Sequence, residues 1–156
     1  MPSALTVFVD TNVLVYAEDR AAGVKQAAAF AWLRELWLPR CGQLSTQVLH
    51  EFYVCATRKL GKPIPPGDAR AEVRRYQLWH PWPNDHATVE AAWAVESRYK
   101  FSYWDALIVA AAQAQGCRYL LSEDLQHEQE IDGVTVIDPF RTGPELLGEY
   151  QPVPRR

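Results

Sequence analysis

The chain has 156 residues, of which 48% are hydrophobic and 22% are charged, and its formal net charge is −3. This length and composition suit one globular domain with a buried core and exclude a disordered chain. The slight negative charge argues against a surface coated for nucleic-acid binding. Basic side chains nevertheless gather in the segment 58–75, which holds Arg58, Lys59, Lys62, Arg70, Arg74 and Arg75.

The first half of the chain predicts two strands and four helices. The apolar run from Leu5 to Val9 predicts a strand buried on both faces. A second, short strand is predicted over residues 42–44, and Asp68 is the expected cap of the fourth helix. The predicted helices span residues 13–17, 24–37, 45–60 and 68–79. In the second helix, the apolar stripe that we expect to be buried is Ala28, Trp32, Leu33 and Leu36.

The second half predicts helices over residues 86–99 and 103–115, and strands over residues 119–122 and 134–137. Ser102 is a suitable cap for the last helix, and Gly116 a suitable residue just after its end. The expected buried stripe of the first of these helices is Val89, Trp93 and Ser97. That of the second is Trp104, Leu107, Ile108, Ala111 and Ala112.

Short apolar strands separated by helices predict a three-layer α/β/α fold with a short central parallel sheet. We expect residues 1–142 to form this domain and residues 143–156, with Pro152 and Pro154, to form a loosely held tail.

The three cysteines, Cys41, Cys55 and Cys117, form no C-x-x-C pair, which argues against a disulfide framework or a zinc site. The chain opens without the basic segment of a signal peptide, and polar side chains interrupt its alanine-rich stretches. We therefore expect a protein of the reducing cytoplasm, with no membrane span.

Four acidic residues lie at boundaries between apolar elements: Asp10, Glu51, Asp105 and Asp124. A structural role explains each of them alone, because acids cap helices, fill turns and favour the first turns of helices. Together they favour a site, since Asp10 and Asp124 follow strands and the carboxyl ends of parallel strands share one edge. Crowded carboxylates repel one another unless a cation intervenes or their pKa values rise. Oxygen ligands without histidine or cysteine favour Mg²⁺ or Mn²⁺ over zinc.

The acids lie in four segments, which are Asp10-Thr11-Asn12, Leu49-His50-Glu51-Phe52, Ser102-Tyr103-Trp104-Asp105-Ala106-Leu107-Ile108 and Leu121-Ser122-Glu123-Asp124-Leu125-Gln126-His127. In type and order these segments resemble the motifs of PIN-domain proteins. Within that family they are most similar to VapC-type toxin ribonucleases of bacterial toxin–antitoxin pairs. The resemblance covers roughly residues 5–140, and its third and fourth segments are the most specific.

The resemblance implies that the acidic catalytic set is Asp10, Glu51, Asp105 and Asp124. Of these, Asp10 and Asp105 are expected to contact the metal, with Asp124 binding it or holding its waters, and Glu51 to position or deprotonate the nucleophile. The residues expected to line the same pocket are Thr11, Asn12 and Ser122. His50 and His127 flank the motifs and are expected to be structural. Two segments depart from the family pattern without removing an acid: Glu128 replaces a frequent glycine, and Asp138-Pro139-Phe140 a frequent Asn-Pro-Phe.

A magnesium site of this kind supports phosphodiester hydrolysis, because the cation polarises the phosphate and orients a bound water. The resemblance implies RNA as the substrate, with 5′-phosphate and 3′-hydroxyl ends. Sequence-selective cleavage of RNA targets unpaired loops, for which the aromatic candidates are Trp79, Trp82 and Tyr103. The basic segment 58–75 suits a phosphate backbone, and a solvated helical face explains it equally well.

Two other functions stay open, a PIN-type RNA-processing nuclease that is not a toxin and a non-catalytic binding module. The chain lacks the lysine of a phosphoacceptor domain, the D-x-D of a haloacid-type phosphatase and glycine-rich nucleotide motifs. The resemblance also implies a homodimer and a cognate antitoxin, whose apolar helix would contact side chains such as Trp32, Trp37 and Tyr53.

Overall fold

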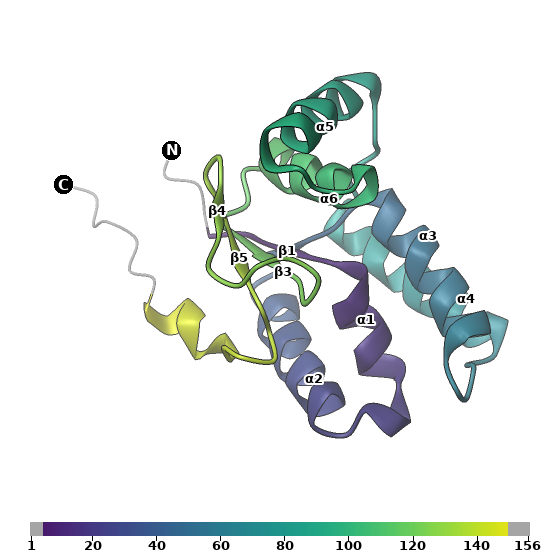
Figure 1. Cartoon of the computed structure of the whole chain (residues 1–156). Helices are drawn as coiled ribbons and strands as arrows, with labels where there is room; N and C mark the ends of the chain where they lie inside the picture. The colour runs from purple at the N-terminus through teal and green to yellow at the C-terminus, as the bar shows by residue number, and fades with distance from the viewer. Residues whose placement is uncertain (1–4, 150–156) are drawn as a thin grey trace.

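A five-stranded sheet forms the centre of the computed structural model, which describes residues 5–149 (Figure 1). The strands lie in the order β2-β1-β3-β5-β4. Their bounds are Val7–Val9 for β1, Gly42–Gln43 for β2, Tyr119–Leu121 for β3, Glu130–Ile131 for β4 and Val134–Ile137 for β5. The first four in this order are parallel, as predicted, and place the ends of β1 and β3 side by side, with Val9 opposite Leu121.

The edge strand β4 is antiparallel to β5, so the sheet is mixed rather than wholly parallel. Asp132 and Gly133 connect the two strands, and both have positive φ angles, of 47° and 97°. A two-residue hairpin turn of this type favours the Asp-Gly pair. The Asp-Gly pair could therefore have predicted the hairpin. The strand β4 has only two residues, which is too short to show an alternating pattern.

Six helices surround the sheet in the described chain: α1 Thr11–Glu18, α2 Val24–Trp37, α3 Thr46–Val54, α4 Pro66–Arg75, α5 His86–Tyr99 and α6 Tyr103–Ala114. Figure 1 shows α1 and α2 on one side of the sheet and α5 and α6 on the other, which gives the predicted α/β/α layers. A π-helical turn, Cys55–Lys59, extends α3, and a 3-10 turn, Tyr76–Trp79, extends α4. The helix predicted to end at residue 60 therefore changes its hydrogen bonding after residue 54.

In α2 the structure buries Ala29 in place of the predicted Ala28, which is only partly buried. Three further predicted helix details are wrong. Pro65 precedes the first turn of α4 and Pro66 begins it, so Asp68 lies within that turn and is not the cap. Proline suits this position because its missing N–H needs no partner there. The buried residues of α5 are Thr88, Ala92 and Val95, whereas Trp93 and Ser97 are exposed. Thr88 is buried because its hydroxyl and amide bind the capping Asp85, while its hydroxyl also accepts from the indole of Trp82.

The third error is Trp104, which we expected on the buried stripe of α6 and which is 62% exposed. It lies in the first turn of the helix, where the face that packs on the sheet begins only with Ala106. Trp32 is fully buried and its Nε1 donates to the carbonyl oxygen of Thr142 at 3.0 Å, so it is not available to a partner protein.

An aromatic cluster fills the space between α2 and the end of α4. Trp37, Tyr76 and Trp79 have ring centroids 4.8 to 5.2 Å apart. Trp79 is 3% exposed and packs on Gly42 so closely that a Cβ there would lie 2.4 Å from its ring. The expectation that Trp79 contacts RNA is therefore wrong, because this indole belongs to the core.

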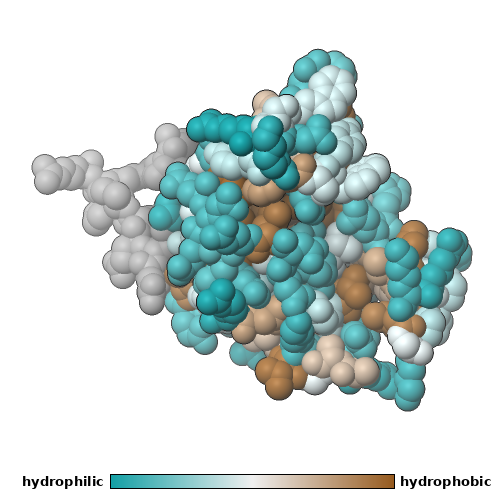
Figure 2. Space-filling view, in the orientation of Figure 1, coloured by the Kyte–Doolittle hydropathy of each residue, from teal (hydrophilic) through white to brown (hydrophobic). Residues whose placement is uncertain are grey.

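The described part of the C-terminal segment is a 3-10 helix, Pro144–Glu149, in which Leu146 and Leu147 pack against the core. The rest of the predicted tail, including Pro152 and Pro154, lies outside the described residues. Among the helices of residues 5–149, none has the length and apolar content that a membrane crossing requires. The face in Figure 2 is largely hydrophilic, with apolar side chains exposed in small patches.

Candidate active site

Asp10 lies at the tip of β1, where its backbone N–H donates to the carbonyl oxygen of Leu121 at 3.0 Å. It also caps α1, since its Oδ1 accepts from the backbone N–H of Thr11 at 2.7 Å. Ser122 follows the neighbouring strand β3, and its hydroxyl donates to Asp10 Oδ2 at 2.8 Å. The two strand ends therefore hold one carboxylate, which is 5% exposed, in a fixed orientation.

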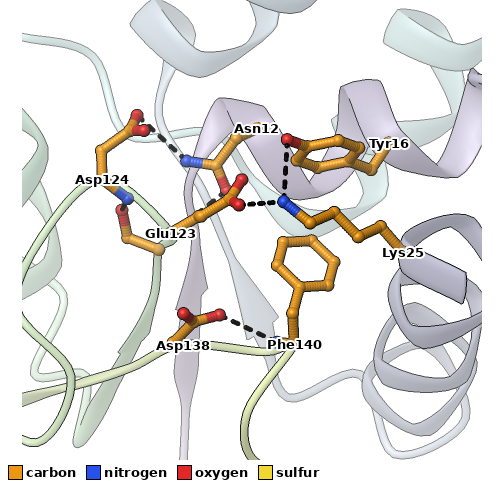
Figure 3. Close-up of polar contacts among 8 residues, drawn as sticks. Asn12, Tyr16, Lys25, Glu123, Asp124, Asp138 and Phe140 are labelled. Atoms are coloured by element: carbon orange, nitrogen blue, oxygen red, sulfur yellow. Dashed lines mark hydrogen bonds and ion pairs between the residues drawn. The ribbon is translucent and has the colours of Figure 1, made fainter. Parts of the chain in front are cut away.

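The first turn of α1 connects Asp10 to two further acids. Asn12 donates from Nδ2 to Asp10 Oδ2 at 3.4 Å and to Asp124 Oδ2 at 3.2 Å. Figure 3 shows this amide pointing at Asp124. The hydroxyl of Thr11 donates to Glu51 Oε2 at 2.7 Å, across the gap between α1 and α3. The predicted pocket residues thus contact the predicted acids directly.

Glu51 comes from the second turn of α3, a helix that Ser45 caps. Its second oxygen, Oε1, accepts from Gln47 Nε2 at 3.0 Å. Both oxygens of this carboxylate therefore have donors, which hold the side chain toward α1 rather than leave it in solvent. Gln47 was not identified from the sequence, although its spacing of four residues before Glu51 places both on one helix face.

Asp105 lies in the first turn of α6, where the hydroxyl of Ser102 accepts from its backbone N–H at 3.2 Å. Burial raises the pKa of its carboxyl, and the charges of Asp124 and Glu51 raise it further. The charges of Asp124 and Glu51 also raise the pKa of Asp10, so both acids are close enough to interact with each of the two predicted metal contacts. The structure thereby brings all four predicted acids to one edge of the sheet.

The pKa of Asp10 is raised to about 7, mainly because burial disfavours the ionised form. Hydrogen bonds from Ser122 and Thr11 lower it, while the charges of Asp124 and Glu51 add to the rise. A nearby cation would have the opposite effect, because it stabilises the ionised carboxylate. A positively charged ligand would therefore lower the pKa of Asp10 and be stabilised by its ionised carboxylate.

Cation ligands at this edge would be hard oxygen atoms, which are the kind that Mg²⁺ and Mn²⁺ prefer. Within residues 5–149, no three His, Cys, Asp or Glu side chains converge closely enough to hold one ion among them. Asn12 Nδ2 instead bridges Asp10 and Asp124. A magnesium ion fits this arrangement, since it keeps several waters and takes only one or two carboxylates directly.

The loop that carries Asp124 is attached to α2 through its neighbour Glu123. Lys25 Nζ is paired with Glu123 Oε1 and also donates to the Tyr16 hydroxyl at 3.4 Å. Its ammonium lies 4.9 Å from the centre of the Tyr16 ring and 5.2 Å from that of Phe140 (Figure 3). This cluster fixes the loop after β3. It could not be predicted from the sequence, because its members are far apart in the chain.

The two histidines beside the motifs differ in their surroundings. His127 accepts from the backbone N–H of Asp138 at 2.9 Å through Nδ1, and its Nε2 lies 3.4 Å from the Thr142 hydroxyl. It therefore has the structural role that we expected. Asp138 in turn accepts from the backbone N–H of Phe140 at 2.9 Å, as in a turn. His50 is exposed and lines a surface depression together with Glu51 and Trp104.

The family model of the PIN domain matches residues 7–129. The chain belongs to the PIN domain family. Among solved structures it is similar to VapC20 of Mycobacterium tuberculosis, described as a sarcin-ricin loop cleaving toxin, with a TM-score of 0.55 and 20% identity over 74% of this chain and 87% of that one.

It is also similar to VapBC2 of Rickettsia felis, described as bound to a DNA fragment from its promoter, with a TM-score of 0.57 and 11% identity. That match covers 85% of this chain and 97% of the other. At these identities the two likenesses show a shared fold. No curated protein matches the chain by sequence.

Proposed function

We propose that this protein is a Mg²⁺-dependent endoribonuclease and the toxin of a type II toxin–antitoxin pair. The observation that carries the proposal is Asp10, a nearly buried carboxylate at a strand tip, with a pKa raised to about 7 beside further acids. Paired acids with perturbed pKa values in one site are typical of catalysis or metal binding. Membership of the PIN domain family and the fold shared with VapC20 support the same assignment.

In this proposal Asp10 and Asp105 contact the metal, and Asp124 binds it or holds its waters, with Mn²⁺ as a substitute for Mg²⁺. When bound, the cation supplies Lewis acidity toward the phosphate and lowers the pKa of a coordinated water. The raised pKa of Asp10 implies that this carboxylate gains most from the cation. Asn12 then orients Asp10 and Asp124 through its amide, while the Ser122 hydroxyl holds Oδ2 of Asp10.

Glu51 acts on the nucleophile, by positioning it or accepting its proton. Thr11 and Gln47 each donate to one of its oxygens and so restrict the side chain to one orientation. Attack by water on the phosphorus, with cleavage of the P–O3′ bond as the family resemblance implies, leaves a 5′-phosphate and a 3′-hydroxyl. This reaction requires no 2′-hydroxyl, so the choice of RNA over DNA depends on substrate contacts rather than on the chemistry.

We further propose a homodimer and a cognate antitoxin that covers the acidic site. Val24, Phe30 and Leu38 expose apolar side chains on or beside α2, so they replace the buried Trp32 as candidate contacts. The three cysteines are free within the described chain, as in a protein of the reducing cytoplasm. We propose residues 1–142 as the nuclease domain.

The test is cleavage of RNA by purified protein in Mg²⁺, in Mn²⁺ and in EDTA. We expect cleavage only with the metals, with 5′-phosphate product ends, and none with Asp10→Asn or Asp105→Asn. Asp85→Asn is the matched control, because Asp85 also caps a helix but lies on α5, outside the acidic set. Undiminished cleavage in EDTA would refute the metal assignment, and a fully active Asp10→Asn would refute the site.

A further inference from the structure

We propose that a groove beside Glu51 binds an unpaired segment of RNA, with one nucleobase stacked on Trp104 and the adjoining phosphates on Arg70 and Arg74. The inference rests on the proposed function, because it places the substrate beside the acids assigned to cleavage. Beyond the proposed function, it names the residues that would bind the RNA and the direction in which the strand would leave the site.

The first part of the groove is a depression of about 490 Å³ lined by Thr46, Gln47, His50, Glu51, Asn84 and Trp104. Trp104 immediately precedes Asp105 and exposes 62% of its surface, although the large apolar residues of α6 are otherwise buried. Its ring packs edge-on against Tyr103, at 5.3 Å between centroids. An exposed indole beside two acids of the proposed site is a stacking surface for a base next to the scissile phosphate.

Two amides form the floor beside this indole. Gln47 is 8% exposed and donates from Nε2 both to Glu51 Oε1 and to the carbonyl oxygen of Trp104, at 3.0 and 3.3 Å. Asn84 donates to Gln47 Oε1 at 3.3 Å. The Oδ1 of Asn84 is buried and has no hydrogen-bond partner within residues 5–149. Buried acceptors without partners are rare. Because Asn84 lines the depression, a rotation of its amide would present this oxygen to the amino group of a nucleobase.

The groove continues into a second depression of about 330 Å³, which shares Thr46 and His50 with the first. Tyr53, Arg70 and Arg74 line this part, and Arg70 Nη2 donates to the Tyr53 hydroxyl at 3.2 Å. Both arginines are exposed, so their charge is available to a polyanion. The groove therefore runs from an acidic, metal-binding end to a basic end, as a strand with one phosphate at the metal and others farther along would require.

The structure divides the basic segment 58–75 between two faces. Arg74 lines the groove, whereas the guanidinium of Arg75 lies 4.3 Å from the centre of the Trp37 ring and pairs with Glu72 at 2.9 Å. Arg75 is thus attached to the aromatic core and not to the proposed RNA path. The earlier hypothesis of a phosphate track is restricted to Arg70 and Arg74.

RNA suits this groove better than an apolar helix of a partner protein. An apolar helix would offer no partner to Asn84 Oδ1 and none to the exposed guanidinium groups of Arg70 and Arg74, which is unfavourable. A nucleotide combines a base with a flat face for the indole, hydrogen-bonding groups on the base edge for Asn84, and phosphates that match the arginines.

The test is binding of a fluorescently labelled, short single-stranded RNA of random sequence to the full-length protein in EDTA, followed by anisotropy. Without metal no cleavage is expected, so binding is measured alone. Trp104→Ala should weaken binding on the order of 10-fold, whereas Trp104→Phe should retain most of it, because stacking needs only an aromatic face. Trp104 is exposed, so both variants should keep the unfolding temperature of the wild type.

Arg74→Gln should reduce the slope of log affinity against log salt by about 0.7, the value for one phosphate contact on a single strand. Lys59→Gln is the matched control, since Lys59 is exposed on the neighbouring π-helical turn and does not line the groove. It should leave affinity and slope unchanged.

Unchanged RNA affinity in both Trp104→Ala and Arg74→Gln would overturn the inference and assign the groove to a protein contact. A wild type that binds no RNA would overturn it as well. RNA binding that depends on Trp104 in a protein that never cleaves RNA would instead support the groove and refute the proposed function.

Discussion

Replacing Asp10 by asparagine should stabilise the metal-free protein at neutral and alkaline pH. In the unfolded chain this carboxyl ionises near 3.8, whereas in the folded protein its pKa is raised to about 7, mainly by burial. Between these values the folded state binds the proton more tightly, so the stability of the wild type falls as the pH rises through this range. The penalty is complete above about pH 7 and absent only well below pH 3.8, where both states are protonated.

This difference in pKa means that the ionised carboxylate lowers the free energy of unfolding by on the order of 4 kcal/mol. Asparagine avoids this penalty and still caps α1, because it is among the preferred capping residues. Its NH₂ group cannot accept the bond from Ser122, which forgoes about 1 kcal/mol. The net gain is about 3 kcal/mol, or a rise of about 6–12 °C in unfolding temperature for a chain of this size.

The assay is thermal unfolding of wild type and Asp10→Asn in EDTA, from pH 4 to pH 9. At about pH 4, where the penalty is small, the variant should be no more stable than wild type, because the Ser122 bond is lost. The difference should then turn in favour of the variant and increase to a plateau above pH 7. Asp85→Asn is the control, because hydrogen bonds from Thr88 lower the pKa of this exposed cap, and the variant should gain nothing at any pH. An Asp10→Asn protein that is less stable than wild type at pH 8, or a gain that does not depend on pH, would refute the reasoning.

Three further predictions concern residues outside the acidic set. Glu128 has a φ of 67°, and Glu128→Gly should raise the free energy of unfolding by up to about 1 kcal/mol, while Glu128→Ala should not, as denaturant melts would show. Gly42→Ala should lower it by about 1–3 kcal/mol in the same assay, because the new Cβ would overlap the ring of Trp79. Lys25→Gln should slow RNA cleavage by loosening the loop at Glu123, with less than about 1 kcal/mol of destabilisation, and Lys25→Arg should restore the rate. A cleavage rate in Lys25→Gln equal to that of wild type would remove Lys25 from the account.

The sequence was sufficient for the features that depend on local chemistry. The predicted strand ends placed Asp10 and Asp124 at one edge, and the resemblance to PIN-domain motifs added Glu51 and Asp105. The structure brings the four acids together there. The departure from the family pattern expected at Glu128 coincides with a positive φ of 67°, a backbone conformation that glycine adopts most readily.

Features that depend on packing between distant segments were not predictable. Val89 and Thr88 are neighbours in α5, and only the contacts of Thr88 with Asp85 and Trp82 decide which one is buried. The spacing of Trp104 matches the apolar stripe of α6, but the buried residues of this helix begin only with Ala106. The sequence pattern does not show where along the helix burial begins. Likewise, Arg74 and Arg75 are adjacent in sequence, yet successive positions on a helix point in different directions, which separates their roles.

The most direct test of the central claim is to map the 5′ ends of cellular RNA after expressing the wild type and Asp10→Asn in parallel. The account predicts new 5′-phosphate ends at defined positions in unpaired RNA with the wild type, and none of these with Asp10→Asn at equal protein levels. The same new ends in both samples, or no new ends with the wild type, would contradict it.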